Sequence, residues 1–297
     1  MIRPGSGPLP SFIVIGAMKA GTTSLHHYLA AHPDLHLPGT KELNFFRDER
    51  HFSRGEGWYR AQFAGARPGQ QAGEVSPDYT KHPRHKGAPA RMRAVVPDVR
   101  LVYLVRHPVR RMRSMYLHQV AAGRERRPVD EALLEDPHYL DVSRYALQVE
   151  RYLEHFPREQ LLVASSEQLA VDRPGVLASV HRFVGVAARP DTAAAVEGEW
   201  YRGEQRRRRG GVARAAAAVP LVRRSFDRLP TGLRSGVLRL GSSAVPAGTA
   251  DTSPATDAVL AERLRPDLLR FRAVAPEVVD GWALLDRPPG EDRGTGT

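Results

Sequence analysis

The residues best suited to chemistry lie in a loop near the start of the chain. Residues 16–25 read Gly-Ala-Met-Lys-Ala-Gly-Thr-Thr-Ser-Leu and follow an apolar run that predicts a buried strand. A helix that Thr22 opens after such a loop directs its N-terminus and several backbone N–H groups at one point, which suits an anion. The spacing of Gly16 and Gly21 matches a nucleotide-triphosphate loop, but Thr22 stands where that motif needs lysine, and Lys19 lies inside the loop. We therefore predict a phosphate-bearing nucleotide and a reaction other than ATP or GTP hydrolysis.

A second candidate anion site follows residues 100–106, whose apolar centre predicts another buried strand. Arg106 stands at the carboxyl end of this strand, where open α/β sheets bind ligands. Pro108 favours the first turn of the next helix. That helix carries Arg110, Arg111, Arg113, Ser114 and Tyr116. A guanidinium group binds phosphate through two parallel hydrogen bonds, so Arg106 predicts a second phosphate on the ligand. We expect Arg110 and Arg113 to lie on a solvated face of the helix.

Together the two motifs resemble the donor site of sulfotransferases that use 3′-phosphoadenosine-5′-phosphosulfate (PAPS), most closely the glycosaminoglycan (heparan sulfate) branch. That branch carries Gly-x-x-Lys-x-Gly-Thr-Thr-Ser-Leu as its 5′-phosphosulfate loop and Arg-x-Pro-x-x-Arg-x-x-Ser-x-Tyr as its 3′-phosphate site. The resemblance covers residues 9–187 and implies that PAPS is the co-substrate and that Lys19 is catalytic. The donor contacts that it implies are Lys19, Ala20, Gly21, Thr22, Thr23, Ser24, Arg106 and Ser114.

Two segments between these motifs resemble the acceptor side of the same family. Residues 41–46, Lys-Glu-Leu-Asn-Phe-Phe, resemble its Lys-Glu-x-x-Phe-Phe segment, which implies that Glu42 is the catalytic base and that Lys41 lies at the acceptor. Residues 73–79 resemble its Glu-x-Ser/Thr-Pro-x-Tyr segment. Glu74 is then either a second acidic residue at the acceptor or a structural partner for an arginine. Without the resemblance, a Lys-Glu pair indicates a solvated loop and Ser-Pro-Asp indicates a turn.

The last third of the chain has weaker patterns. The run of arginines and glycines at residues 204–211 indicates an exposed, mobile loop. Many sulfotransferases close such a loop over the donor, which implies donor contacts from Arg208, Arg209 and Gly210. We expect short helices at residues 213–218 and 237–240, a loop at 241–256, and a terminal helix at 260–271 that ends near Trp282.

Strand–loop–helix units in sequence predict an α/β fold, a P-loop-like three-layer sandwich with a parallel sheet flanked by helices. The strands that we expect are residues 12–16, 100–106 and 161–164, and apolar positions at helical spacing predict a helix from Tyr145 to Leu153. We expect a single sulfotransferase domain over residues 9–286, with flexible tails at 1–8 and 287–297. Its core is expected at 9–187, and the part at 188–286 is expected to be helical and to include the basic loop that closes over the donor.

Composition narrows the class of protein. The absence of cysteine excludes disulfides and thiolate metal sites. No apolar stretch approaches the roughly 20 residues that cross a bilayer, and the first residues lack the apolar centre of a signal peptide, so we expect a cytoplasmic protein. The net charge is +11 and only four of the 44 basic residues are lysines. This arginine bias, with abundant alanine, glycine and proline, is typical of a GC-rich bacterial genome, and the positive field favours anionic ligands.

The expected function is in-line, metal-independent transfer of a sulfuryl group from PAPS to a hydroxyl or amine of a glycan, glycolipid or secondary metabolite. No metal is expected, because Lys19 and the loop do what magnesium does for triphosphates. Three alternatives stay open: a P-loop nucleotide kinase or NTPase, a non-catalytic PAPS-binding protein, and a basic nucleic-acid-binding protein. The sequence has no zinc-ligand spacing, RNA-binding aromatic signature or helix-turn-helix pattern, so nucleic acid is not an expected partner. Nothing in the sequence indicates an oligomeric state.

Overall fold

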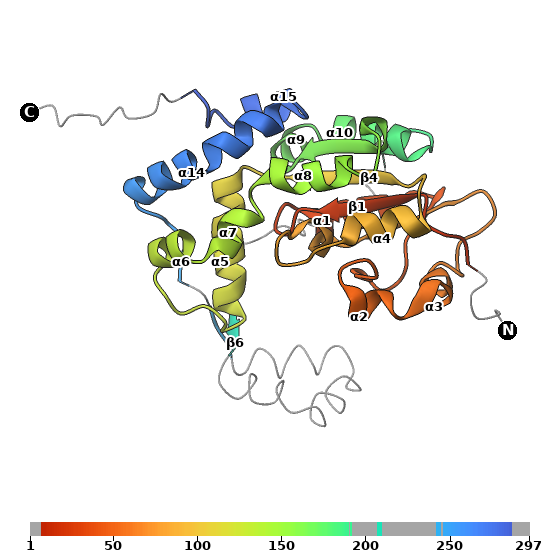
Figure 1. The fold of residues 1–297 in the computed structure, drawn as a ribbon, viewed down its shortest axis with the longest axis horizontal. Helices are drawn as coiled ribbons and strands as arrows, with labels where there is room; N and C mark the ends of the chain where they lie inside the picture. Colours follow the sequence, from red (N-terminus) through yellow and green to blue (C-terminus); the bar gives the residue numbers. More distant parts are fainter. Residues whose placement is uncertain (1–6, 190, 192–206, 210–241, 245, 287–297) are drawn as a thin grey trace, which may run out of the picture.

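A five-stranded parallel sheet organises the computed structural model, which describes residues 7–189, 191, 207–209, 242–244 and 246–286 (Figure 1). Its strands stand in the order β2-β3-β1-β4-β5, and each neighbouring pair is parallel. They are β1 Phe12–Gly16, β2 Leu35–His36, β3 Gln71–Val75, β4 Arg100–Val105 and β5 Leu161–Ser165. The predicted parallel α/β fold is confirmed, and the three predicted strands agree with β1, β4 and β5 to within one residue.

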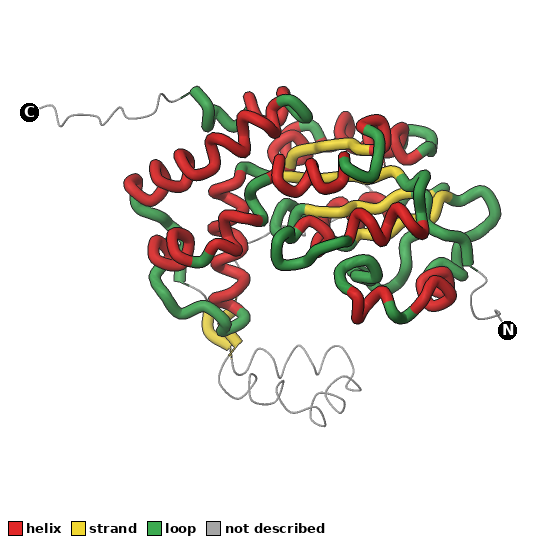
Figure 2. Tube along the Cα trace, viewed as in Figure 1, coloured by secondary structure: helices red, strands yellow, loops and turns green. Residues whose placement is uncertain are grey.

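Helices cover both faces of this sheet (Figure 2). They are α1 Thr22–Ala30, α2 Glu49–Phe52, α3 Gly55–Ala61, α4 Ala88–Val95, α5 Pro108–Ala121, α6 Val129–Glu135, α7 Pro137–Asp141, α8 Tyr145–Leu153, α9 Ser166–Val171, α10 Arg173–Val184, α14 Pro254–Arg272 and α15 Pro276–Asp280, with 3-10 turns η1 Pro77–Thr80 and η2 Arg158–Gln160.

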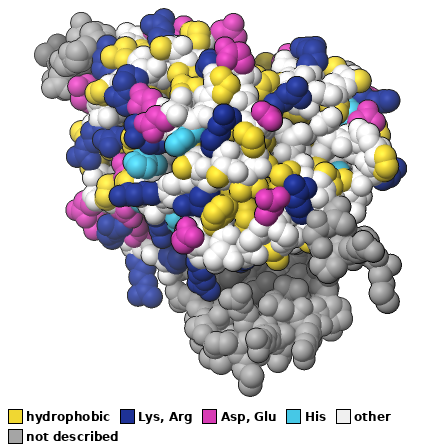
Figure 3. Space-filling view, turned by 45° about the vertical axis from the view of Figure 1, so that its right-hand side comes forward, with side chains coloured by type: hydrophobic (Ala, Val, Ile, Leu, Met, Phe, Trp, Pro, Cys, Tyr) yellow, Lys and Arg dark blue, Asp and Glu magenta, His cyan; other side chains and the backbone are white. Residues whose placement is uncertain are grey.

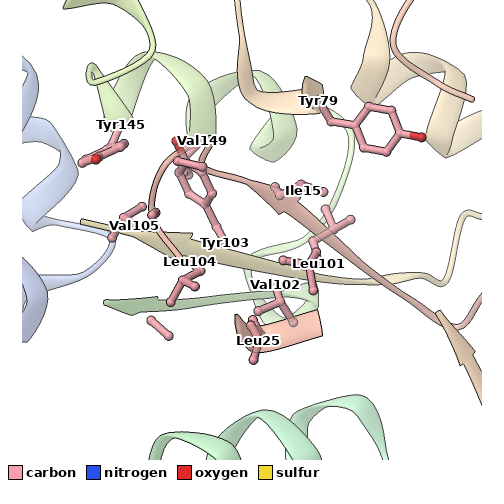
Figure 4. Packing of buried hydrophobic residues seen from close by; sticks show 14 of the residues in the cluster. Ile15, Leu25, Tyr79, Leu101, Val102, Tyr103, Leu104, Val105, Tyr145 and Val149 are labelled. Carbon is pink, nitrogen blue, oxygen red and sulfur yellow. The ribbon is translucent and has the colours of Figure 1, made fainter. Parts of the chain in front are cut away.

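Figure 4 shows Tyr103 of β4 pointing toward Val149 of α8, whereas Val102 and Leu104 point to the opposite side, where Leu25 of α1 lies. Successive side chains of a strand alternate between faces, so complete burial of β4 from Leu101 to Val105 requires cover on both.

β3 is a strand that its own residues do not predict, because Gly73 and Glu74 have low strand propensity. Gly73 packs under the Phe12 ring of β1, and a Cβ at this position would overlap that ring. The strand forms because it pairs with β1 on one side and β2 on the other. Neighbouring strands therefore override local preference here.

The described parts of the last third differ from the prediction in two places. The expected loop at 241–256 contains β7 Ser242–Ala244 and the first residues of α14, which begins where the Ser253 side chain accepts the Thr256 N–H at 3.1 Å. α14 packs along α8, and its Asp267 carboxylate accepts the N–H groups of Ala146 and Leu147. At the other end of the chain, Arg60 donates to the carbonyl of Gly7, which belongs to the expected tail at 1–8, at 3.3 Å. The helices expected at 213–218 and 237–240, and the tail at 287–297, lie outside the described residues.

Candidate active site

The loop between β1 and α1, residues 17–21 and here called the donor loop, has the backbone that an anion site needs. Gly21 is the N-cap of α1 with φ of 94°, and Lys19 has φ of 74°, so the loop curves tightly through two left-handed residues. The first turn of α1 holds no acidic residue, and no side chain caps its N-terminus. The N–H groups and positive dipole of this helix end are therefore suited to a negatively charged group. Gly16 is required for packing, since a Cβ there would overlap the Thr80 side chain.

Two helices hold this loop from outside. The guanidinium Nη1 of Arg111 on α5 donates to the Met18 carbonyl at 3.4 Å. The Ser166 hydroxyl at the start of α9 donates to the Ala20 carbonyl. Because these bonds fix carbonyl groups in the middle of the loop, they also fix the direction of the peptide N–H groups beside them.

The second motif lies at the same end of the sheet, where the carboxyl ends of the parallel strands meet. β1 and β4 are paired in parallel, so the loop after β1 and Arg106 after β4 are neighbours, as predicted. The Tyr145 hydroxyl donates to the Arg106 carbonyl at 2.6 Å, and the Glu167 carboxylate accepts the His107 N–H at 3.0 Å. Ser114 lies on α5 and is 8% exposed. The donor contacts expected of Arg106 and Ser114 remain predictions.

Arg111 and Arg113, which follow Arg106 along α5, have structural partners. Arg111 is fully buried and donates to the Ser143 hydroxyl and the Tyr139 carbonyl, each at 2.6 Å. The Arg113 side chain is 30% exposed, so the expected solvated face is only partly correct, because its guanidinium also has a partner. Its Nη2 donates to both Asp257 oxygens, at 2.8 and 2.6 Å, and thereby joins α5 to α14. Arg110 is exposed, as expected.

The structure places Glu42 beside the donor loop through Lys41. The Lys41 ammonium lies 2.7 Å from Glu42 Oε1 and donates to Thr23 Oγ1, in the first turn of α1, at 3.2 Å. The Glu42 side chain is 42% exposed, so a ligand can reach its carboxylate. Glu42 itself has φ of 64°, a conformation that few residues other than glycine adopt.

Glu74 is placed differently from either expected alternative. It is 1% exposed and accepts hydrogen bonds from the hydroxyls of Tyr59, Tyr79 and Ser76 at 2.9, 2.9 and 3.1 Å. Among the described residues its hydrogen-bond partners are these hydroxyls, not an arginine. Burial raises the pKa of Glu74 to about 7, and the three hydroxyls partly oppose that shift. Because the carboxyl is enclosed in this way, we expect no direct contact between Glu74 and an acceptor.

Sequence reasoning missed Lys81, Asp78 and Arg47, which form a charged group near Glu42. The Lys81 ammonium lies 2.5 Å from Asp78 Oδ1, and Arg47 Nη1 lies 3.4 Å from Asp78 Oδ2. Burial lowers the pKa of Lys81, while the charges of Asp78 and Glu42 oppose that shift. One signal was available. Only four lysines occur in the chain, and of these Lys19 and Lys41 lie in the motifs of this site and Lys81 lies two residues after the segment at 73–79.

Part of the basic run expected to form a mobile loop is a strand. β6 Arg207–Arg209 pairs antiparallel with β7, with Arg208 opposite Ser243 and Arg209 opposite Ser242. β6 contacts α5, the helix that carries Ser114 (Figure 1). The expectation of a loop is therefore wrong for these three residues, and Gly210 lies outside the described residues.

Comparison with known proteins identifies the family. The family model described as "Sulfotransferase domain" matches residues 9–206. The chain belongs to this family. The predicted sulfotransferase family is thus confirmed, and the match includes the donor loop, Glu42, Glu74 and Arg106.

Curated relatives agree with this assignment. The human heparan sulfate glucosamine 3-O-sulfotransferase 3A1 is 35% identical over 196 residues, which cover 63% of this chain and 47% of that protein. The human 3B1 enzyme is 35% identical over 192 residues, which cover 61% of this chain and 47% of its own. This sulfotransferase chain therefore matches about half the length of these relatives.

Solved structures share the fold. The crystal structure of a sulfotransferase from Alicyclobacillus acidocaldarius superimposes with a TM-score of 0.66 at 27% identity and covers 93% of this chain and 99% of that chain. Mouse sulfotransferase SULT7A1 complexed with PAP, 14% identical, superimposes with a TM-score of 0.51 over 93% of this chain and 88% of its own. At that identity the likeness concerns the fold alone.

The described surface carries charges of both signs. On the face drawn in Figure 3, acidic and histidine side chains stand among the lysines and arginines. Within the described ranges, no helix is both long and apolar enough to cross a membrane. The same residues include no cluster of three or more histidine, aspartate or glutamate side chains that could hold a metal ion.

Proposed function

We propose that this protein transfers a sulfuryl group from PAPS to a hydroxyl or amine of an acceptor, with Glu42 as general base. The contact of Lys41 with both Glu42 and Thr23 carries this proposal. It puts a solvent-accessible carboxylate next to the helix end that is suited to the donor's phosphosulfate. An in-line transfer needs the base close to the donor's reacting group, so that the acceptor can bind between them.

The residues at the sheet edge fit the two anionic ends of PAPS. The N-terminus of α1, the Thr22 and Thr23 hydroxyls and Lys19 would bind the 5′-phosphosulfate. Arg106 and Ser114, on the neighbouring strand end and helix, would bind the 3′-phosphate. We also assign donor contacts to Arg208 and Arg209, since β6 lies against α5, and, from the family resemblance alone, to Gly210.

The proposed mechanism is a single displacement at sulfur. Glu42 accepts the proton of the acceptor hydroxyl or amine as its oxygen or nitrogen bonds to sulfur, while the bond from sulfur to the bridging phosphate oxygen breaks. Lys19 and the loop N–H groups stabilise the charge that grows on that oxygen and on the departing 5′-phosphate. Donors preorganised in this way supply a large electrostatic part of catalysis without a metal ion.

The acceptor class that we favour is a glycan hydroxyl. The two human relatives are named as 3-O-sulfotransferases of heparan sulfate glucosamine. Their names suggest an amino-sugar polysaccharide as the first acceptor to test here. Glycolipids and hydroxylated secondary metabolites are the next classes.

A direct assay tests the proposal. The protein is incubated with ³⁵S-labelled PAPS and heparan sulfate in the presence of EDTA, and label in the polysaccharide is counted. Glu42→Gln serves as the inactive control, and extracts of metabolites replace heparan sulfate in a second series. Labelled product that depends on Glu42 supports the proposal. Metal-dependent ATP hydrolysis, or no transfer to any acceptor despite tight PAP binding, would overturn it in favour of an NTPase or a non-catalytic nucleotide-binding protein.

A further inference from the structure

Glu74 is a buried acid that the proposed mechanism leaves without a role. It lies on β3, 1% exposed, and its partners are three hydroxyl groups rather than a cation. Taking a carboxyl group out of water without a cationic partner is unfavourable. The residue therefore calls for an explanation beyond packing.

Two of these hydroxyls connect Glu74 to the turn that carries Glu42. The Ser76 oxygen accepts the Asn44 N–H, and the Tyr79 oxygen accepts the Phe46 N–H, each at 3.2 Å. At a pH above its raised pKa Glu74 is ionised, and an ionised carboxylate only accepts hydrogen bonds. Both hydroxyl protons therefore point at Glu74, and both oxygens turn their lone pairs toward the N–H groups of the turn.

The turn has a backbone that needs external support. Glu42 and Asn44 have φ of 64° and 56°, in the left-handed region. Such residues persist where surrounding contacts determine their conformation. Here the contacts come from β3 and the residues after it, because the Glu42 N–H also donates to the Val75 carbonyl at 3.1 Å.

We propose that Glu74 is a positioning residue for catalysis: its carboxylate orients the Ser76 and Tyr79 hydroxyls, which hold the turn at residues 42–46 so that Glu42 faces the donor loop. This inference rests on the proposed role of Glu42 as base. In either orientation, the NH2 group of a glutamine at position 74 faces the Tyr79 or the Ser76 hydroxyl. That hydroxyl can no longer donate to residue 74, so its proton is no longer held away from the backbone N–H of the turn.

The chain offers a matched control for this idea. The hydroxyls of Tyr59 and Tyr79 both lie 2.9 Å from Glu74 Oε1, and both rings are buried. Only Tyr79 also accepts an N–H of the turn, because Tyr59 has Glu74 as its one hydrogen-bond partner within the described chain. Tyr59→Phe and Tyr79→Phe thus remove the same bond to Glu74, but only the second removes a bond to the turn.

The experiment compares Glu74→Gln, Ser76→Ala, Tyr79→Phe and Tyr59→Phe with the wild type. Amide hydrogen exchange of peptides that cover residues 42–46 is measured by mass spectrometry. PAP affinity and kcat with PAPS and heparan sulfate are measured on the same proteins. We expect the first three variants to exchange these amides on the order of tenfold faster and to lose about 10- to 100-fold in kcat at unchanged PAP affinity. Tyr59→Phe should match the wild type in all three.

The outcomes separate this inference from the proposed function. Equal effects of Tyr59→Phe and Tyr79→Phe, or normal exchange in Glu74→Gln, would show that Glu74 is only a packing residue and would overturn the inference. If Tyr79→Phe does not fold, Ser76→Ala makes the same comparison with a smaller side chain. An inactive wild type would overturn the proposed function, while the exchange pattern, which needs no substrate, still decides whether Glu74 holds the turn.

Discussion

Arg111 on α5 donates a hydrogen bond to the carbonyl of Met18, and this contact of 3.4 Å connects the two motifs that we expect to bind phosphate. Arg111 is fully buried, so the bond is shielded from water. The motif expected to bind the 3′-phosphate thus also shapes the loop expected to bind the 5′-phosphosulfate. Arg111, the central arginine of the 3′-phosphate motif, does so by fixing the carbonyl of Met18 in the other loop.

Replacement of Arg111 should lower stability and donor affinity together. Arg111→Lys keeps the charge, but one ammonium cannot reach Ser143, Tyr139 and Met18 at once. We expect a loss of roughly 2–4 kcal/mol in unfolding free energy, because buried acceptors lose their donors. Urea denaturation and PAP calorimetry measure the two effects. Arg110→Lys, on the exposed face of the same helix, should change neither, and equal losses in both variants would contradict this account.

The donor site should distinguish nucleotides by their 3′-phosphate. The wild type should bind PAP much more tightly than AMP, without added metal, because Arg106 supplies a second anion contact. Arg106→Ala should cost about 2–5 kcal/mol of PAP binding and leave AMP binding nearly unchanged. Titration calorimetry with both nucleotides provides the measurement. Equal affinity of the wild type for PAP and AMP would remove the basis for a 3′-phosphate site.

Glu42 and Lys19 should differ in which step they affect. Glu42→Gln is nearly isosteric but cannot take a proton, so turnover should fall by about 10²-fold or more while PAP affinity stays constant. Lys19→Ala should reduce both, because Lys19 contacts the phosphosulfate before and during the reaction. Single-turnover rates with labelled PAPS and PAP calorimetry separate the two. Normal turnover by Glu42→Gln would place the base elsewhere. Because Glu74 is enclosed, the search would then move to half-buried histidines such as His82.

The raised pKa of Glu74 should be visible in the pH dependence of the unfolding free energy. Burial raises its pKa to about 7 from an ordinary value of 4.5, so the folded state favours the protonated form. The wild type therefore loses stability as pH rises through this window, whereas Glu74→Gln does not titrate. The unfolding free energy of the variant relative to the wild type should rise by roughly 3 kcal/mol between about pH 4.5 and pH 7.

Urea denaturation at several pH values across this window measures the change. Glu56→Gln is the control, since the Glu56 side chain is 50% exposed and pairs with Arg60 on the surface. It should show no comparable trend. A constant difference between Glu74→Gln and the wild type at every pH would mean that the pKa of Glu74 is not raised.

Local sequence patterns predicted the elements that build the donor loop. The apolar run of β1, the N-cap glycine at position 21 and Pro108 at the start of α5 are signals carried by neighbouring residues. They were sufficient to put the loop and Arg106 at one sheet edge. The resemblance to sulfotransferases was also sufficient to select Lys41 and Glu42, which the structure puts beside Thr23.

The missed features depend on residues far apart in the sequence. Arg113 donates to Asp257, which lies 144 positions away in the sequence, and no local pattern predicts such a contact. The carboxyl of Glu74 is enclosed by side chains from α3, from Ser76 and from η1, so its burial follows from tertiary packing rather than from β3 itself. Lys81 is buried for the same reason, although a lone lysine after a turn signal indicates an exposed residue.

The left-handed backbone at Glu42 has a consequence for protein engineering. Residues 41–46 do not encode their own shape, because the groups that hold their N–H donors belong to residues 75, 76 and 79. A chimera that takes this turn from a relative to change acceptor preference would receive the base without its support. The two segments must be exchanged as one module, together with the acid at position 74, for a transplanted base to arrive in working orientation.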